Sequence, residues 1–475
     1  MADKEGLQHA GDYDLDGALI VGSSGEKINV HGQVKELNIY QSIDCPFMSG
    51  NMLIADSQGV AEILPLMGQE RLLFSLKTPG HSNTVNFNKY HAIIYNVEKR
   101  FQTSDREQTI FLNWTTLEHY KNIRTKISKS FNGTISSIVQ KILKDKNYLG
   151  TKKPVNIDVT KNLRKYVIPN LNPFQAINLL KTEAISSVEQ SPHFLFFENP
   201  NGFHFRSLDS LIGQKGSLSV QHKQTYRFQP PEAPQNPEKT LGTILEWEVS
   251  DNFNNFLGVK LGMHSSTLYY HDIFNKNVQR FVYSYSKSFK KRNSLSQESK
   301  KSGSLVSGAK IDDKTITEYP NSKIFVHPTA SDKLHSLGTD NNAEEWLQES
   351  QSRELEREYF TLKITTHGDT DIMCGDLINV IIPSNKPLGK TGGKGAMDPI
   401  LSGRYLITSL HHIVVPSESS HAMIMTIMKD STESAISVMD IQYPQEPQGS
   451  ADVGLNKRKL TTKTKSSYFD MWGEG

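Results

Sequence analysis

The chain has little cysteine, little net charge and no long apolar run. Only Cys45 and Cys374 are cysteines among 475 residues. They are too few for a disulfide framework or a cysteine metal site, and we expect both to be buried as small hydrophobic side chains. The 53 basic and 51 acidic residues give a net charge of +2. This balance argues against a protein that wraps nucleic acid or carries an acidic tail.

Membrane and secretion signals are also missing from the sequence. No stretch approaches the ~18–20 apolar residues that a membrane-spanning helix needs. The polar N-terminal segment lacks the apolar core of a signal peptide, so we expect none. The hydrophobic fraction is 36%, which is low for a single large core. Since the length suggests three or four domains of about 100–200 residues each, we expect a multi-lobed protein with a large surface.

The most informative stretch is residues 168–211, which predicts a helix followed by a hairpin. Asn172 is a good N-cap, and Pro173 falls at the first helical position, where its missing N–H costs nothing. An apolar helical face follows at three- and four-residue spacing, made of Ile177, Leu180, Ala184 and Val188. Two aromatic strands, 194–197 and 203–205, then flank an Asn-Pro-Asn-Gly turn.

Strand patterns on both sides of this stretch predict two antiparallel β-barrels. Residues 12–118 hold about six strands and one short helix at 60–70, broken by Pro65. Residues 351–443 return to the same pattern, with strict alternation at 360–365 and an apolar strand after Asp376. The predicted fold class is therefore α+β, mainly β.

The remaining segments are assigned by composition and periodicity. Residues 119–228 are predicted as a helical and hairpin domain. Helix is expected over 115–149, with the apolar face Ile135, Ile138, Val139, Ile142 and Leu143. Residues 229–240 form a Pro-rich linker whose prolines exclude regular structure. Residues 241–350 are a small β domain with a basic Ser/Lys-rich insert at 287–310, interpreted as a solvated loop rather than a nucleic-acid patch.

Two further segments complete the predicted organisation. A charged helix is expected over 342–358, with a weak apolar stripe of Trp346, Leu347 and Leu355. Residues 444–475 are a flexible C-terminal tail that ends in aromatic residues, as a docking peptide or as simple disorder.

No segment carries a convincing catalytic, cofactor or metal motif. Gly389-Lys390-Thr391 resembles the end of a phosphate-binding loop, but the first glycine of that motif is missing and no helix signal follows. His411 and His412 are adjacent on a strand, so they point to opposite faces and cannot share one metal. A calcium or metal loop could be sketched from His367, Asp369, Asp371 and Asp376, but EF-hand spacing is absent. We therefore predict no catalytic, cofactor-binding or metal residue.

The amino-acid sequences of several segments are similar to those of one protein family. "NPFQAI" followed by "FLFFENPNGFHFRSLDSL" resembles the baseplate hub proteins of contractile-tailed (myovirus) bacteriophages, which are related to type VI secretion spike hubs. "GDTDIMCGDLINVIIP", "DPILSGRYLITSLHHIV" and "HAMIMTIMKDS" form the second strongly hub-like segment. The resemblance covers most of residues 12–440. It is weak at 287–350 and in the tail.

This resemblance implies a structural virion protein rather than an enzyme. It implies two tail-tube-like barrel domains per chain and a homotrimer, so that six similar surfaces join a six-fold tail tube to a three-fold central spike. Implied partners are the spike, tube or tube-initiator proteins, the tape-measure protein and baseplate wedge proteins, with DNA passing only transiently through the bore. The implied location is the tail baseplate, assembled in the bacterial host cytoplasm. The alternatives are a tail-associated cell-wall hydrolase and the hub of a contractile secretion machine.

Overall fold

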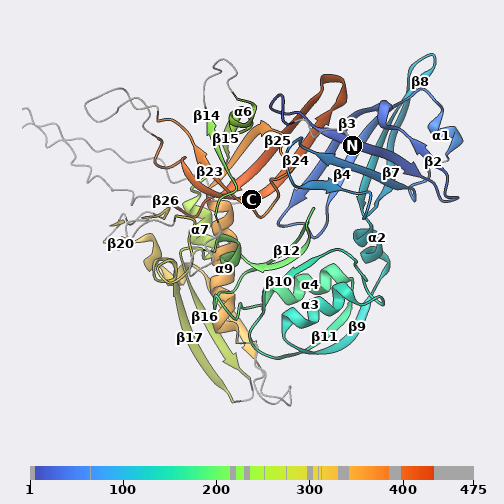
Figure 1. The fold of residues 1–475 in the computed structure, drawn as a ribbon. Coiled ribbons are helices and arrows are strands. Elements are labelled where there is room, and N and C mark those ends of the chain that lie inside the picture. The colour runs from blue at the N-terminus through green and yellow to red at the C-terminus, as the bar shows by residue number, and fades with distance from the viewer. Residues whose placement is uncertain are drawn as a thin grey trace, which may run out of the picture. The chain divides into compact units, whose positions relative to one another are not determined.

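The computed structural model describes residues 6–64, 66–213, 221–228, 236–250, 252–273, 275–296, 303–306, 308, 310–311, 313–329, 342–384 and 397–432. Strands dominate these residues (Figure 1). This confirms the predicted class, α+β and mainly β. Within the described residues, no helix is both long and apolar enough to span a membrane.

Consecutive strands near the N-terminus form an antiparallel sheet that we call the first barrel, although no pairing among the described strands closes it into a ring. Its strands pair in the order β2 (Lys27–Asn29), β1 (Asp14–Val21), β5 (Arg71–Lys77), β7 (Ala92–Ser104), β8 (Glu107–Thr116), β4 (Ser49–Asp56) and β3 (Val34–Ser42), with β6 (Thr84–Asn86) on β5. Every pairing is antiparallel, as predicted. Two short helices, η1 (His31–Gln33) and α1 (Val60–Ile63), lie between strands. The core centres on the fully buried Trp114, whose ring meets Phe74 and Phe87 edge-on.

The second barrel is a closed ring of six strands drawn from distant parts of the chain. Around the ring they are β24 (Gly403–Val415), β23 (Leu377–Ile381), β14 (Gln224–Phe228), β15 (Thr243–Ser250), β22 (Thr361–His367) and β25 (Ser420–Met428). Pairing of β25 with β24 closes the ring. β14 runs parallel to both of its neighbours. The ring thus takes strands from outside the predicted range 351–443, because β14 and β15 supply its far wall.

The predicted linker also contains regular structure. α6 (Pro237–Leu241) begins where Asn236 caps the helix, accepting the Glu238 N–H at 3.1 Å, and proline occupies the first helical position. The expectation that prolines exclude helix was wrong here, since proline is tolerated in a first helical turn. Residues 229–235 of the predicted linker lie outside the described residues.

A helical lobe with a buried hairpin follows the first barrel. Its elements are α2 (Leu117–Arg124), β9 (Ile127–Gly133), α3 (Ile135–Lys144), β10 (Val155–Ile157), β11 (Arg164–Leu171), α4 (Pro173–Thr182), β12 (Phe194–Asn199), β13 (Gly202–Ser207) and α5 (Leu208–Ile212). The predicted face of α3 is confirmed, and all five of its apolar residues are buried. Helix was wrongly expected over 127–133, where β9 pairs with β11.

The predicted helix after Asn172 is confirmed with its cap, but it is shorter than expected. α4 starts at Pro173 behind a capping box of Asn172 and Gln175, and it ends at Thr182. Val188, assigned to its apolar face, is 79% exposed. The hairpin of β12 and β13 is confirmed, with Phe196 opposite Phe205 and the turn between Asn199 and Gly202.

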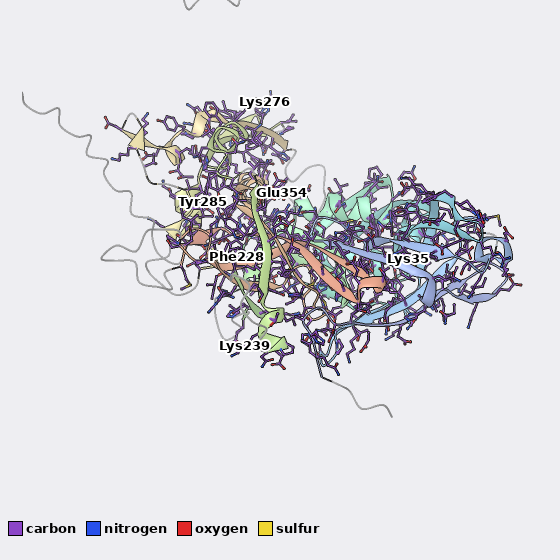
Figure 2. The ribbon with its side chains drawn as sticks, turned by 90° about the horizontal axis from the view of Figure 1, so that it is seen from above. Lys35, Phe228, Lys239, Lys276, Tyr285 and Glu354 are labelled. Carbon is purple, nitrogen blue, oxygen red and sulfur yellow. The ribbon has the colours of Figure 1, made fainter. Side chains whose placement is uncertain are left out.

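A three-stranded sheet and a long helix form the part of the chain between β15 and β22. The sheet contains β17 (Asn277–Ser284), β16 (Ser265–Asp272) and β21 (Ile324–Thr329), and α9 (Ala343–Tyr359) packs against it. Lys276 marks the turn between β16 and β17 (Figure 2). Smaller elements here are α7 (Asn255–Leu261), α8 (Tyr285–Phe289), β18 (Gly303–Ser304), β19 (Lys310–Ile311), β20 (Lys314–Thr315), η2 (Ile316–Glu318) and η3 (Pro320–Ser322).

Two predictions for this region were wrong in the same way. The buried face of α9 is mostly polar, with Gln348, Ser352, Arg353, Glu356 and Arg357 buried between Ala343 and Tyr359. The residues of the expected apolar stripe, Trp346, Leu347 and Leu355, are only partly buried. The basic insert is not wholly solvated, since Arg292 and Leu295 are buried. Charged side chains take buried positions here because they pair with one another.

The last described elements are η4 (Pro416–Glu418), between β24 and β25, and β26 (Ser431–Thr432), which pairs with β18. The Gly389-Lys390-Thr391 segment, residues 297–302 of the insert and the tail 444–475 lie outside the described residues.

Candidate assembly interface between the two barrels

The two barrels share one continuous sheet because β3 of the first pairs with β24 of the second. The register runs antiparallel from Ser42 opposite Ser409 to Leu37 opposite Val414. Beyond the strand ends, the Ile43 N–H donates to the Thr408 carbonyl at 2.9 Å. A shared ladder of main-chain hydrogen bonds fixes the two barrels in one orientation, since a slip of one residue would turn every side chain to the wrong face.

The two adjacent histidines occupy opposite sides of this seam, as predicted. His411 is half-buried, lies 4.4 Å from the Tyr40 ring and is 2.7 Å from the Asn38 amide oxygen. His412 is fully buried and meets His421 of β25, Nδ1 to Nε2, at 3.1 Å. Burial holds the pKa of His412 well below its usual value and lowers that of His421 to about 3. Both rings are therefore neutral at physiological pH.

Next to the seam, a loop of the first barrel forms hydrogen bonds with a loop of the second barrel. Thr78 and Thr370 donate reciprocally, each main-chain N–H to the other hydroxyl, at 3.0 Å. His81 Nδ1 lies 2.7 Å from Asp369 Oδ1 and 3.6 Å from Asp371 Oδ2. The Asn83 N–H donates to Asp371 Oδ1 at 2.8 Å. The contact thus joins the loop after β5 to the loop after β22.

Two residues of the sketched metal loop, His367 and Asp376, are not in the group of converging ligand atoms. His367 lies against Gly11 near the N-terminus, where a Cβ on that glycine would come within 3.4 Å of its Nδ1. Asp376 pairs with Lys223 at 2.8 Å. The structure therefore brings Asp369 and Asp371 together with His81, which no local motif had indicated.

The hairpin of the helical lobe contacts both barrels from below the seam. Its aromatic side chains divide between two cores, because β12 is buried on both faces. Phe194, Phe196, Phe203 and Phe205 pack on the helices. On the other side, Leu195 and Phe197 share a cluster with Ile43 of the first barrel and Leu406 of the second. Burying apolar surface from three units at one place ties them together.

Glu198 of the same hairpin makes polar contacts with the first barrel. It accepts from Thr116 Oγ1 at 2.9 Å and from the Met48 N–H at 3.2 Å. Lys153 pairs with Glu198 and, at 2.8 Å, with Glu118. The cavity beside this cluster holds about 20 Å³. That is room for about one water molecule, so two carboxylates near each other here cannot receive a polysaccharide.

A buried ionic cluster fixes α9 to the lobe and to the end of the second barrel. Arg353 is fully buried and pairs with Asp209 of α5, with Glu356 at 2.9 Å and with Asp430 at 4.0 Å. Arg292 also pairs with Glu356. Burial and then the neighbouring Glu356 raise the pKa of Asp430. Buried charges of this kind persist only when paired, so the cluster specifies how these elements dock.

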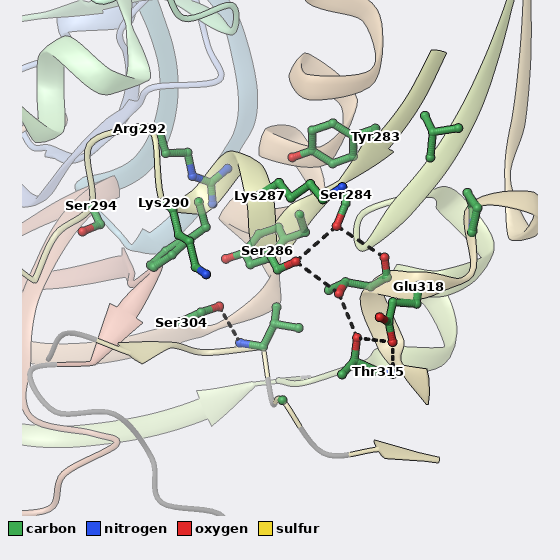
Figure 3. Close-up of a pocket in the computed structure, with 17 residues that line it drawn as sticks. Tyr283, Ser284, Ser286, Lys287, Lys290, Arg292, Ser294, Ser304, Thr315 and Glu318 are labelled. Atoms are coloured by element: carbon green, nitrogen blue, oxygen red, sulfur yellow. Dashed lines mark hydrogen bonds between the residues drawn. The ribbon is translucent and has the colours of Figure 1, made fainter. Parts of the chain in front are cut away.

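A hollow of about 950 Å³ lies beside β17 and α8 (Figure 3). Its lining carries hydroxyls and basic side chains, including Ser286, Lys290 and Arg292. Glu318, the carboxylate among its described lining residues, accepts the Thr315 N–H and hydroxyl as a helix cap. Glycoside hydrolysis needs two facing carboxylates, which this lining does not offer.

The two cysteines are free thiols. Cys374 is buried, as expected, whereas Cys45 is half-buried. Burial raises the pKa of Cys374 well above its usual value. A thiol kept protonated in this way is a poor nucleophile, so Cys374 contributes packing at the seam.

Comparison with known proteins finds similar solved structures but no match at the level of sequence. No family model and no curated protein sequence matches the chain. The tail protein from Neisseria meningitidis MC58 is similar over 88% of this chain and 97% of its own length, with 13% identity and a TM-score of 0.52. The 43 kDa tail protein of prophage MuSo2 from Shewanella oneidensis covers 87% and 98%, with 11% identity and a TM-score of 0.49.

A secretion-system protein is also among the similar structures. The E. coli c3393 protein, a component of the type VI secretion system, covers 89% of this chain and 78% of its own length, at 10% identity and a TM-score of 0.39. At these identities the likeness concerns the fold, and the argument for it rests on the Neisseria structure. The chain has the fold of a phage-type tail protein, which confirms at the level of fold the resemblance read from its sequence.

Proposed function

We propose that this protein is a structural subunit of a phage-type tail baseplate, in which three copies form a hub. Each chain contributes two barrels, so three chains present six barrels in a ring. Such a ring mates with a six-fold tail tube on one side and with a three-fold spike on the other. The spike, tube, tape-measure and wedge proteins are the proposed partners, and DNA passes through the bore only in transit. The proposed location is the tail of the virion, assembled in the host cytoplasm.

The observation that carries this proposal is the β3–β24 seam. One sheet runs from the first barrel into the second without a break. The two barrels therefore form one rigid arc with a fixed relative orientation, unlike two domains joined by a flexible linker. Closed rings arise when one heterologous contact repeats through a fixed rotation. A rigid two-barrel arc supplies the fixed rotation that such closure requires.

The sides of the barrels away from the seam carry exposed apolar side chains. In the six-strand ring, β15 lies three pairings from β24 in either direction, which is directly opposite the seam. It exposes Leu245 at 49% and Val249 at 41%. In the first barrel, β7 lies three pairings from β3 and exposes Tyr95 and Phe101 at 51% and 53%. We propose that these two outer faces meet between neighbouring chains, since exposed apolar groups mark association surfaces.

The mass of the purified full-length chain in solution tests the trimer. Light scattering after size exclusion should give about 160 kDa, three times the 53.5 kDa chain. Negative-stain images should show a three-fold ring with six lobes. A stable 53.5 kDa species at micromolar concentration would contradict the hub.

A paired substitution tests the proposed contact face. Leu245→Glu with Val249→Glu places charge on the outer face of β15 and should convert the trimer to monomers. The control is Val188→Glu, which introduces one glutamate at a site 79% exposed on the helical lobe and should remain trimeric. Loss of the trimer in both variants, or in neither, would overturn the assignment of this face.

A non-enzymatic role accompanies the proposal. A cell-wall hydrolase needs a groove with paired carboxylates, and neither the Lys153 cavity nor the hollow beside α8 supplies one. A hollow of about 810 Å³ near the N-terminus is lined by Asp12 and Asp14, and Asp12 there accepts the Gln8 and His9 N–H groups. A zymogram of the purified protein on bacterial cell wall should therefore stay blank. A clearing zone would favour the hydrolase, and trimer formation would then be judged separately by the mass measurement.

A further inference from the structure

Three potential ligand atoms for one cation converge where loops of the two barrels meet. His81, Asp369 and Asp371 each direct one nitrogen or oxygen to a common point, and these atoms all lie within 4.8 Å of one another. His81 comes from the loop between β5 and β6, and the two aspartates come from the loop between β22 and β23. The loops are held in place independently by the reciprocal Thr78–Thr370 hydrogen bonds.

The spacing of these atoms fits a transition-metal ion. His81 Nδ1 lies 2.7 Å from Asp369 Oδ1 and 3.6 Å from Asp371 Oδ2. Two ligands at 2.0–2.2 Å from a tetrahedral ion are about 3.4 Å apart, a value between these two distances. We propose that His81, Asp369 and Asp371 bind one divalent transition-metal ion of the Zn²⁺ type, which locks the two barrels together.

The charge around the cluster favours a cation. Three carboxylates, those of Asp369, Asp371 and Asp376, gather in this loop. Lys223 neutralises one of these charges, because it forms an ion pair with Asp376 at 2.8 Å. It also donates a hydrogen bond to the Asp371 main-chain carbonyl at 3.0 Å. Asp369 is only 3% exposed. A buried carboxylate whose negative charge is not fully neutralised by a cationic side chain is stabilised by coordination to a cation.

An unpartnered hydroxyl provides a second, independent indication. Tyr226 of β14 is fully buried, and its Oη has no hydrogen-bond partner among the described residues. Burial, followed by the nearby carboxylates of Asp369 and Asp376, raises the pKa of Tyr226 well above its usual value. The Tyr226 hydroxyl is therefore near these carboxylates and has no hydrogen bond to them. With three protein ligands, a tetrahedral ion keeps one water, and that water would supply the partner that Tyr226 lacks.

The ligand types separate this site from a calcium site. Ca²⁺ takes six to eight oxygen ligands and does not favour imidazole, whereas one histidine with two carboxylates suits Zn²⁺ and its neighbours. His81 would have to be neutral and would coordinate through Nδ1. Without metal, the same nitrogen carries a proton and donates to Asp369.

Cobalt(II) provides a spectroscopic test on the full-length chain. The protein is first stripped with a chelator and then titrated with Co²⁺, which gives visible absorption in low-coordinate N/O sites. We expect one saturable equivalent whose absorption is lost when Zn²⁺ is added. Zn²⁺ should also raise the Tm in a concentration-dependent way, because it binds the folded state.

Two ligand variants and one matched control complete the design. His81→Gln and Asp371→Asn should each lose the cobalt absorption and the Zn²⁺-dependent rise in Tm. The asparagine retains an oxygen to accept the Asn83 N–H, and circular dichroism of the metal-free proteins identifies any variant that fails to fold. The control, Asp12→Asn, alters an exposed histidine–aspartate pair, His9 and Asp12, 3.9 Å apart. It should bind as the parent does.

Three results would overturn the proposal. They are the absence of a saturable Co²⁺ equivalent in the parent, unchanged binding in both folded ligand variants, and a Tm rise with Ca²⁺ equal to that with Zn²⁺. The first two would leave the cluster as a hydrogen-bonded clasp. The trimer measurement is independent of all three results, so failure of the metal site would not disturb the proposed tail role.

Discussion

The two barrels are built from different kinds of sequence. The first uses strands that follow one another between residues 14 and 116, pairs them all antiparallel, and fills its core around Trp114, Phe74 and Phe87. The second collects strands from residues 224 to 428 and needs the parallel strand β14 to complete its ring. Its core combines aliphatic side chains and methionine with the buried aromatic residues Tyr226, Tyr285, Tyr359, Phe360 and Tyr405.

The difference extends to what surrounds each barrel. The second barrel ends near the buried cluster of Arg353 with Asp209 and Asp430, and its paired strands β24 and β25 carry the neutral pair His412 and His421. The first barrel is held mostly by apolar packing, which depends little on pH. A barrel assembled from distant segments thus coincides with paired buried charges that specify docking, whereas the contiguous barrel relies on close packing.

The largest expected effect is at the ionic cluster. Arg353→Met should destabilise the protein by about 3–5 kcal/mol, because it leaves buried Asp209 without its cation and leaves Glu356 with Arg292 alone. Urea unfolding at pH 7 measures the loss. Lys161→Ala, which removes a partly exposed pair with Glu345, is the control and should cost less than about 1 kcal/mol. Equal losses in the two variants would remove the distinction between the barrels.

The next effect tests close packing in the first barrel. A Cβ on Gly50 would lie 2.1 Å from the Asn38 carbonyl oxygen and 2.3 Å from the Trp114 ring. Since main-chain atoms cannot yield, Gly50→Ala should cost about 3 kcal/mol, at the upper end of overpacking effects. Gly32→Ala meets no atom within 4 Å and should be nearly neutral. Thermal unfolding of the two variants measures this difference in stability. Similar Tm values for both would contradict the packing argument.

The smallest effect is a pH dependence that belongs to the seam of the second barrel. The folded pKa of His421 is about 3, lowered by burial from 6.5. A lowered folded pKa means that the unfolded chain binds the proton first, so stability is full above pH 6.5 and falls as the pH drops towards 3. At pH 5 the loss from this group is about 2 kcal/mol. His421→Gln should flatten the curve of unfolding free energy between pH 7 and 5, and parallel curves would refute the assignment.

Local patterns in the sequence predicted the parts whose structure is decided locally. The cap at Asn172, the apolar face of α3, the β12–β13 hairpin and the opposite orientation of His411 and His412 all follow from periods of 3.6 and 2, or from turn chemistry. The interpretation failed where a neighbour distant in sequence overrode the pattern. β9 is a strand because β11 pairs with it, and α9 buries Arg353 because Asp209 and Glu356 receive it.

The candidate metal cluster shows the same limit. Asp369 and Asp371 stood out in the sequence, but His81 lies 288 residues from Asp369 and follows an ordinary turn. By itself the sequence determined the class of fold, the contiguous barrel and the helix–hairpin. Only the tertiary structure decided that β14 and β15 complete the second barrel and that the β3–β24 ladder joins it to the first. Strand partners and buried ion pairs depend on long-range contacts, and a local pattern fixes which face of a strand is apolar but not which strand lies beside it.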